Sequence, residues 1–286
     1  MHIVMGATGH VGSAVAETLL ARGEPVGVIT HDPGHADSWR DTKAEIIEAD
    51  VNDVRSLRAA FQRGRRAFLL NPPADVTTDT DRVERGTVAN ILAALSDSGL
   101  EKVVAESTAG AQPGDRIGDL NVLWELEEGL RSQGIPAAIN RAPYYFSNWD
   151  DQLDPIRETG KLQTMYPADL ALPMAAPRDL GKVAADRLLS PVADTGVRYV
   201  EGPDRYSSND VAQAFAEALG RPVEVVVTPR EQWEEAFRKF GFSKPAAASY
   251  ARMTAVSLDG RFDYDERSIR GGTTLDEYIR QLVARS

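Results

Sequence analysis

The stretch Gly6-Ala7-Thr8-Gly9-His10-Val11-Gly12 lies between a short β-branched run, His2–Met5, and a segment with helical periodicity, Val11–Arg22. Apolar residues recur at positions 11, 14, 15 and 19 of that segment, and Gly23 ends it. In a strand–turn–helix unit, one glycine permits the tight turn, another lets the backbone approach a pyrophosphate, and the third lets helix and strand pack closely. Free N–H groups and the helix dipole then hold the anion. The stretch therefore predicts a dinucleotide-binding turn.

The alternation of apolar runs and helical patterns continues to about residue 140. Further strands are expected at Val26–Thr30, Ala44–Glu48, Ala67–Leu70, Lys102–Ala105 and Pro136–Asn140, and helices at Val54–Phe61, Asp79–Ser98 and Leu120–Ser132. Strands and helices at this spacing form right-handed βαβ units, with helices on both faces of a mainly parallel sheet. The fold class predicted is α/β, with a Rossmann-type doubly wound parallel sheet.

Beyond about residue 143 this alternation weakens. Helices are expected at 178–189, 208–219, 230–240 and 275–284, and strands at 197–200 and 223–227. We therefore predict an NAD(P)-binding Rossmann domain over residues 1–150. A smaller C-terminal α/β lobe over residues 151–286, interleaved with the first domain, would contact the substrate or a partner.

The composition excludes several classes of chemistry. The 286 residues include no cysteine, and all four histidines lie at or before His35. Thiol nucleophiles, disulfides and cysteine-ligated metals are therefore excluded, and we expect no metal site. The acidic stretch Asp263–Glu266 is most simply a surface loop. The net charge of −11 argues against a nucleic-acid partner. No targeting or membrane signal stands out, so we expect a cytoplasmic protein.

The GxxGxxG spacing resembles the short-chain dehydrogenase/reductase superfamily in its atypical branches. Later segments resemble the NmrA-like family more specifically, among them Ala49–Val51, Leu69–Pro73, Val103–Thr108 and Ile139–Tyr145. That family holds quinone-reductase-like enzymes together with non-enzymatic redox sensors. The glycine loop and the resemblance together imply a cofactor site made by Gly6, Thr8, Gly9, His10, Val11, Gly12, Thr30, His31, Asp50, Val51, Asn71, Pro72, Pro73 and Ser107.

The choice between NAD and NADP is made at the end of the second strand. An acidic side chain there bonds the ribose 2′-hydroxyl and repels a 2′-phosphate. This chain has Thr30-His31 at that point, where NmrA-like NADP binders usually carry arginine. His31 can stack on adenine and donate one hydrogen bond to a phosphate, or it can be a solvated turn residue. We expect NADP(H), with NAD(H) as the alternative.

The Tyr-x-x-x-Lys pair of most short-chain dehydrogenases is absent. None of the eight tyrosines has a lysine four residues later. The family resemblance places Leu123 at the Lys or His position and Asp119 at the Tyr position. The usual proton-transfer machinery for alcohols and ketones is therefore missing, and no catalytic residue is assigned. The two substitutions also disfavour an isoflavone-reductase-like or epimerase-like enzyme.

Two functions remain open. As an oxidoreductase, the protein would pass hydride from NADPH to a quinone or small carbonyl acceptor, with water protonating the product. The acceptor would contact a set of aromatic and polar residues: Thr108, Leu123, Tyr144, Tyr145, Asn148 and Trp149. Alternatively, the aromatic side chains of this set only form the core that joins the two lobes. As a redox sensor, the protein would bind the dinucleotide and recognise a protein partner without turnover. The apolar Leu123 favours the sensor slightly, whereas the lack of a basic tail or a disordered partner-binding segment favours the enzyme. We predict the oxidoreductase, with the sensor as the alternative.

Overall fold

The computed structural model describes residues 1–260 and 268–285, so the acidic stretch Asp263–Glu266 lies outside the described residues. In the described part of the chain, eight parallel strands form one sheet in the order β13-β10-β6-β5-β4-β1-β2-β3. These strands are β1 (His2–Val4), β2 (Val26–Thr30), β3 (Glu45–Glu48), β4 (Arg66–Leu69), β5 (Lys102–Thr108), β6 (Ala137–Ala142), β10 (Gly196–Glu201) and β13 (Ile269–Arg270). The order reverses between β1 and β4, which confirms the doubly wound Rossmann-type fold.

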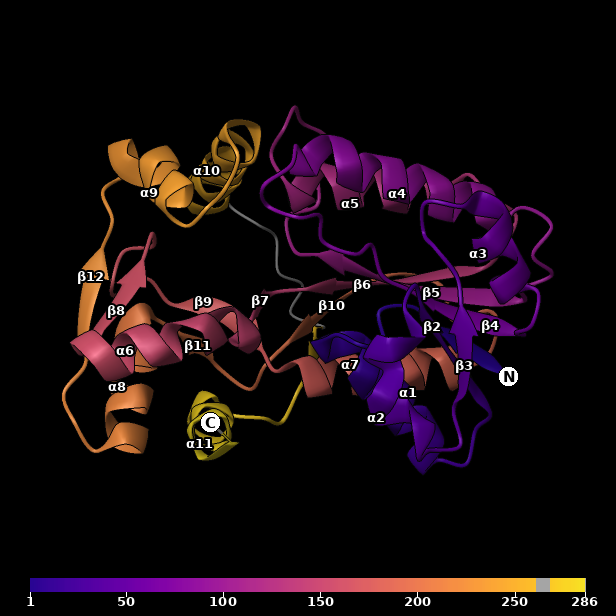
Figure 1. Cartoon of the computed structure of the whole chain (residues 1–286), viewed down its shortest axis with the longest axis horizontal. Helices are drawn as coiled ribbons and strands as arrows, with labels where there is room; N and C mark the ends of the chain where they lie inside the picture. Colours follow the sequence, from indigo (N-terminus) through magenta and orange to yellow (C-terminus); the bar gives the residue numbers. More distant parts are fainter. Residues whose placement is uncertain (261–267, 286) are drawn as a thin grey trace.

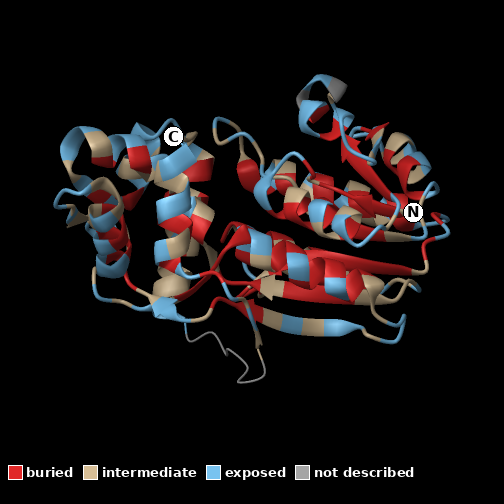
Figure 2. Cartoon of the chain, turned by 90° about the horizontal axis from the view of Figure 1, so that it is seen from below, coloured by how far each residue is buried: buried red, intermediate tan, exposed pale blue. Residues whose placement is uncertain are grey.

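Helices cover both faces of this sheet (Figure 1). One face carries α3 (Val54–Phe61), α4 (Thr80–Leu95) and α5 (Asp119–Arg131), and the other carries α1 (His10–Ala21) and α7 (Pro177–Leu189). The short η1 (Pro33–Ala36) and α2 (Asp37–Arg40) follow β2. Because both faces are covered, the central strands are buried almost throughout, as Figure 2 shows in red.

Helices α1 and α7 approach closely because α7 contains a glycine at the crossing. A Cβ atom built on Gly181 would lie 2.5 Å from the Cβ of Ala14. A larger residue at position 181 would push α7 away from α1. Since α1 begins at the glycine loop, this packing helps to fix the position of the loop.

The smaller lobe is built around two further sheets. One contains β7 (Tyr144–Tyr145), β9 (Leu172–Ala175) and β11 (Arg205–Tyr206), and the other pairs β8 (Lys161–Thr164) with β12 (Glu224–Val227). Its helices are η2 (Phe146–Gln152), α6 (Leu153–Thr159), α8 (Ser208–Leu219), η3 (Arg230–Gln232), α9 (Trp233–Lys239), α10 (Lys244–Asp259) and α11 (Leu275–Arg285). Phe146, Trp149 and Phe215 lie in its core.

The two halves of the sequence are interleaved. Although α7, β10 and β13 come from the second half of the chain, they complete the large sheet and its lower layer (Figure 1). The division at residue 150 remains a prediction. None of the helices in the described ranges is long and apolar enough to cross a membrane.

Candidate functional site

The glycine loop connects β1 to α1, and the space around its three glycines differs. Gly6 has a φ of +66°, a left-handed conformation that favours glycine. A Cβ atom on Gly12 would lie 2.2 Å from the backbone oxygen of Gly6, so only glycine fits there. A Cβ on Gly9 would instead come no closer than 3.4 Å to its nearest atom, which is again the Gly6 oxygen. The loop therefore needs Gly6 and Gly12 for its own packing, whereas Gly9 leaves open space beside the helix terminus.

The N-terminus of α1 is available to an anion. Gly9 is the N-cap and supplies no side chain to bond the first N–H groups of the helix, and the first turn contains no acidic residue. Residues Gly9–Gly12 form part of the wall of a cavity. A helix N-terminus without a side-chain cap leaves its first backbone N–H groups available, and such N–H groups suit a pyrophosphate.

That cavity has a volume of about 510 Å³ and extends from the glycine loop to the smaller lobe. It lies at the carboxyl ends of β1, β4, β5 and β6, where the strand order reverses and where doubly wound sheets bind ligands. The predicted site residues that line it are Gly6, Gly9, His10, Val11, Gly12, Asn71, Pro73, Ser107, Thr108, Leu123, Tyr144, Tyr145 and Asn148. The predicted residues Thr8, Thr30, His31, Asp50, Val51, Pro72 and Trp149 do not line it.

The turn after β2 is organised by its own side chains. The hydroxyl of Thr30 donates to the backbone oxygen of Asp32 (2.9 Å), and a carboxylate oxygen of Asp32 accepts the N–H of Gly34 (2.7 Å). His31 is exposed at this turn. Asp32 is therefore the N-cap of η1, and the His31 side chain lies at the surface of the same turn.

Trp149 is only 3% exposed and packs against Tyr144, with ring centroids 5.5 Å apart. It belongs to the core of the smaller lobe, as the alternative interpretation of the aromatic cluster suggested. A second cavity, of about 450 Å³, lies between α1 and α2 beside Trp39 and Lys43. It shares no residue with the glycine loop, and we give it no role in the chemistry.

Hydrogen bonds fix two polar residues on the cavity wall. The hydroxyl of Ser107 donates to a carboxylate oxygen of Glu127 (2.6 Å), which Arg141 also binds (2.8 Å). The amide oxygen of Asn71 accepts the hydroxyl of Thr87 (2.6 Å). Ser107 thus keeps only its acceptor lone pairs free for a ligand, because its proton is already donated.

The structure adds three carboxyl groups to the cavity wall: Glu84 of α4, Glu106 of β5 and Asp119 of α5. Burial, together with the nearby charges of Asp119 and Asp81, raises the pKa of Glu84 to about 7, although the N–H of Ala74 donates to it (2.9 Å). Burial also raises the pKa of Glu106 well above its usual range and raises the pKa of Asp119. Carboxyl groups of this kind in a cavity are typical of functional sites.

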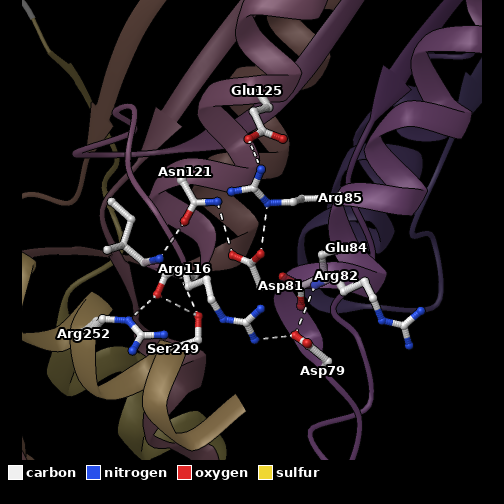
Figure 3. Close-up of polar contacts among 12 residues, drawn as sticks. Asp79, Asp81, Arg82, Glu84, Arg85, Arg116, Asn121, Glu125, Ser249 and Arg252 are labelled. Carbon is white, nitrogen blue, oxygen red and sulfur yellow. Dashed lines mark hydrogen bonds and ion pairs between the residues drawn. The ribbon is translucent and has the colours of Figure 1, made fainter. Parts of the chain in front are cut away.

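Asp119 is held at the start of α5 by an unusual loop. Arg116 has a φ of +53° and Gly118 a φ of +59°, both in the left-handed region. The backbone oxygen of Arg116 accepts from the hydroxyl of Ser249 (3.2 Å) and from Nε of Arg252 (2.9 Å), both on α10. Figure 3 shows α10 joined in this way to the loop. The same helix places Met253 and Ser257 on the cavity wall.

Ion pairs fix α4 against the same loop and α5 (Figure 3). The side chain of Arg116 contacts Asp79 (2.7 Å). The buried carboxylate of Asp81 accepts from Nε of Arg85 (3.0 Å) and from the amide of Asn121 (3.3 Å). These contacts position the two helices that carry Glu84 and Asp119.

Three tyrosines form the aromatic part of the wall: Tyr144, Tyr145 and Tyr166. The rings of Tyr144 and Tyr166 meet nearly at right angles (83°), with centroids 5.8 Å apart. Burial raises the pKa of Tyr166 to about 12, and burial also raises the pKa of Tyr144 and of Tyr145 above the usual range. All three phenols are therefore neutral at pH 7, and none resembles the activated tyrosine of a Tyr-x-x-x-Lys pair.

The chain matches a known protein family over almost its whole length. The model of the NmrA-like family matches residues 2–279. The chain belongs to the NmrA-like family. A nitrogen metabolite regulation-like protein, bik4, from Gibberella fujikuroi is 26% identical and covers 99% of this chain and 96% of its own. Asp119 and Leu123, which the resemblance predicts to stand at the family's Tyr and Lys or His positions, both lie on the cavity wall.

Two solved structures of reductases are similar over the whole chain. The NADPH-dependent quinone oxidoreductase QOR2 from Escherichia coli, complexed with NADPH, has a TM-score of 0.81 at 20% identity, covering 99% of each chain. The triphenylmethane reductase from Citrobacter sp., complexed with NADP(H), has a TM-score of 0.80 at 22% identity, covering 99% of this chain and all of the other. At these identities the similarity establishes the shared fold.

Several cavity residues were not predicted from the sequence. Glu106 directly follows the apolar run Val103–Ala105 within a buried strand, and a carboxyl group at such a position is a signal for a residue with a special role. Asp119 was noticed only as the residue standing in the tyrosine position. Glu84, Tyr166 and Met253 have no local signal, because each comes from a different element and meets the others only in the folded chain.

Proposed function

We propose that the chain binds NADP(H) at the glycine loop and passes hydride to a small, conjugated, electron-poor acceptor such as a quinone. One observation carries this proposal: a single cavity joins the open helix N-terminus of α1 to a wall of tyrosine rings and polar side chains. A dinucleotide and a second ring system need these two surfaces side by side.

The residues present fit a dinucleotide. The backbone of Gly9–Gly12 would hold the pyrophosphate, and Asn71, Pro73 and Ser107 would contact the remainder of the cofactor along the strand ends. When bound, NADPH supplies the hydride. Gly9 supports this assignment, because packing within the protein does not require a glycine there: a Cβ atom would lie 3.4 Å from its nearest neighbour. A glycine at this position instead leaves room for the cofactor to approach the backbone.

NADP(H) is favoured over NAD(H) by the turn after β2. The residue directly after β2 is His31 rather than an acidic residue, and the carboxylate of Asp32 beyond it accepts the N–H of Gly34 as the N-cap of η1. The two similar reductase structures are described as complexes with NADPH and NADP(H), which supports the same choice.

A dinucleotide-dependent regulatory protein is the second candidate. The full-length relative from Gibberella fujikuroi is named as a regulation-like protein, and Leu123 offers no proton where the family has Lys or His. In that case the cavity would bind NADP(H) without turnover, and a protein partner would recognise the bound state. We call the part of the cavity wall that carries the three carboxyl groups and the three tyrosine rings the acceptor end: Glu84, Glu106, Asp119, Tyr144, Tyr145 and Tyr166. The carboxyl groups there favour the reductase, since a sensor needs no second polar surface.

Gly9→Asp tests the cofactor site. We expect a loss of NADPH affinity of more than about tenfold, because a carboxylate would repel the pyrophosphate and block its approach. The measurement is NADPH binding by calorimetry, with thermal unfolding to verify that the variant folds. Turnover is followed by the loss of NADPH absorbance with a panel of quinones. Unchanged affinity in the variant would refute the cradle, whereas tight binding by the wild type without acceptor-dependent oxidation would favour the sensor.

A further inference from the structure

A buried tryptophan joins the segment after β2 to the glycine loop. Trp39 of α2 is 3% exposed, and its indole Nε1 donates a hydrogen bond to the backbone oxygen of Ala7 (3.1 Å). Both residues belong to the hydrophobic core on the α1 side of the sheet, where α2 lies beside α1 (Figure 1). The bond therefore links the glycine loop to a residue that is 32 positions away in the sequence.

The acceptor of this bond belongs to the central peptide of the turn that opens the loop. The N–H of Gly9 donates to the backbone oxygen of Gly6 (2.9 Å) and closes a four-residue turn around Ala7 and Thr8. A trans peptide is planar, and its C=O and N–H point in opposite directions. A bond that fixes the Ala7 oxygen therefore also fixes the direction of the Thr8 N–H.

The other side of this peptide is open to a ligand. Thr8 is exposed, and its N–H has no hydrogen-bond acceptor within residues 1–260 and 268–285. The next residue, Gly9, is the N-cap of α1 and has no side chain to bond the first N–H groups of the helix. The peptide that Trp39 holds thus leads directly into the backbone N–H groups that would meet the pyrophosphate.

Contacts of α2 itself hold the indole in place. The N–H and the hydroxyl of Thr42 both donate to the backbone oxygen of Trp39 (3.1 and 2.8 Å). Upstream, Asp32 is the N-cap of η1, which leads directly into α2. The indole does not line the cavity at the glycine loop, so it affects a ligand there only through the loop.

We propose that Trp39 is a positioning residue for the cofactor, whose indole N–H holds the Ala7–Thr8 peptide in the orientation that the pyrophosphate requires at the start of α1. This inference rests on the proposed binding of NADP(H) at the glycine loop. NADP(H) and NAD(H) share the pyrophosphate and differ only at the ribose 2′ position. Loss of the indole donor should therefore weaken both dinucleotides equally, whereas loss of the His31 side chain should change the preference between them.

A second buried tryptophan provides a matched control. Trp233 of α9 is also 3% exposed, and its Nε1 donates to the backbone oxygen of Thr228 (3.0 Å). This bond lies within the smaller lobe, and neither residue lines the cavity at the glycine loop. The two indoles thus have the same burial and the same kind of bond, but different acceptors. Replacing either by phenylalanine removes one buried hydrogen bond and part of one ring.

The test compares Trp39→Phe with Trp233→Phe. Binding of NADPH and of NADH is measured by calorimetry, and thermal unfolding of both variants verifies that they fold. We expect Trp39→Phe to weaken the binding of both dinucleotides about tenfold and to change the ratio of their affinities by less than about twofold. Trp233→Phe should change either affinity by less than about twofold, although it should lower the unfolding temperature by a similar amount.

The indole N–H resonances of the wild-type protein give a second readout, which remains available if Trp39→Phe does not fold. The chain contains four tryptophans, so the Trp39 signal is assigned by elimination from single Trp→Phe variants at the other three positions: Trp124, Trp149 and Trp233. We expect addition of NADPH to shift the Trp39 signal and to slow the exchange of its proton with water, because the bound pyrophosphate restrains the loop. The Trp233 signal should stay unchanged.

The outcomes separate this inference from the proposed function. Equal losses of NADPH affinity in the two variants, an unchanged affinity in folded Trp39→Phe, or a Trp39 signal that does not respond to NADPH would overturn the positioning role and leave the cofactor site in place. A loss confined to NADPH would also overturn it, because Trp39 would then act through the turn after β2. A wild-type protein that binds neither dinucleotide would overturn the cofactor site together with this inference. Tight binding without oxidation of NADPH by quinones would overturn the reductase alone.

Discussion

The glycine loop and the acceptor end of the same cavity are built in opposite ways. The loop is made by seven consecutive residues, Gly6–Gly12, and its geometry follows from where glycine is required. The acceptor end is assembled from α4, β5, α5, β7 and the loop after β8, which are far apart in the sequence. In the proposed function the loop holds one kind of ligand, a phosphate group. The acceptor end combines carboxyl groups and tyrosine rings from separate elements, so substitutions there need not alter the loop.

The largest effect expected concerns the loop itself. Gly12→Ala places a Cβ atom 2.2 Å from the oxygen of Gly6, so the helix and the strand must separate. We expect a loss of about 3 kcal/mol in the free energy of unfolding, measured by urea denaturation. Gly9→Ala is the matched variant, since its Cβ would have at least 3.4 Å of clearance. It should cost less than about 1 kcal/mol of stability and should weaken NADPH binding instead. Equal losses of stability in both variants would contradict the distinction between packing and cofactor glycines.

The next effect concerns titration at the acceptor end. Burial and the charges of Asp119 and Asp81 raise the pKa of Glu84 from 4.5 to about 7. The hydrogen bond from the N–H of Ala74 opposes this shift, and the phenol of Tyr250 also lies near the Glu84 carboxyl group. Between these two values the folded protein binds more protons than the unfolded chain, so stability falls as pH rises. From about pH 5.5 to 8, wild-type protein without cofactor should lose about 2 kcal/mol relative to Glu84→Gln.

The control for this titration is Glu128→Gln, an exposed residue of α5 whose carboxylate contacts Arg131. The pH dependence of unfolding in that variant should follow the wild type. If the stability of Glu84→Gln and that of the wild type change in parallel across the whole pH range, Glu84 does not titrate within it, and the raised pKa of Glu84 would be wrong.

The smallest effect concerns the turn after β2. His31→Ala removes the exposed imidazole while leaving the bonds from Thr30 to Asp32 and from Gly34 to Asp32 in place. We expect the ratio of NADP to NAD affinity to fall about threefold, as for the loss of one exposed hydrogen bond. The measurement is competition between the two dinucleotides in both proteins. An unchanged ratio would show that His31 does not discriminate between them.

The sequence predicted most of the Rossmann-type sheet and the glycine loop, because both depend on local periodicity and on glycine positions. It did not predict α10 (Lys244–Asp259), whose alanine and serine residues give only a weak apolar stripe. Without α10, the positions of Met253 and Ser257 could not be inferred. Glu84 and Tyr166 were missed for the same reason: their proximity to the cofactor site depends on how distant elements pack. Glu106 could have been noticed, since a carboxylate within a buried apolar strand is unusual.

A single-turnover experiment tests the central claim most directly. The protein is loaded with one equivalent of NADPH and mixed rapidly with a quinone, and the absorbance of the bound NADPH is followed. We expect the bound NADPH to be oxidised at a rate that rises with quinone concentration. Bound NADPH that stays reduced across a panel of quinones would contradict the proposed reductase, and the cavity would then be a dinucleotide-sensing site without chemistry.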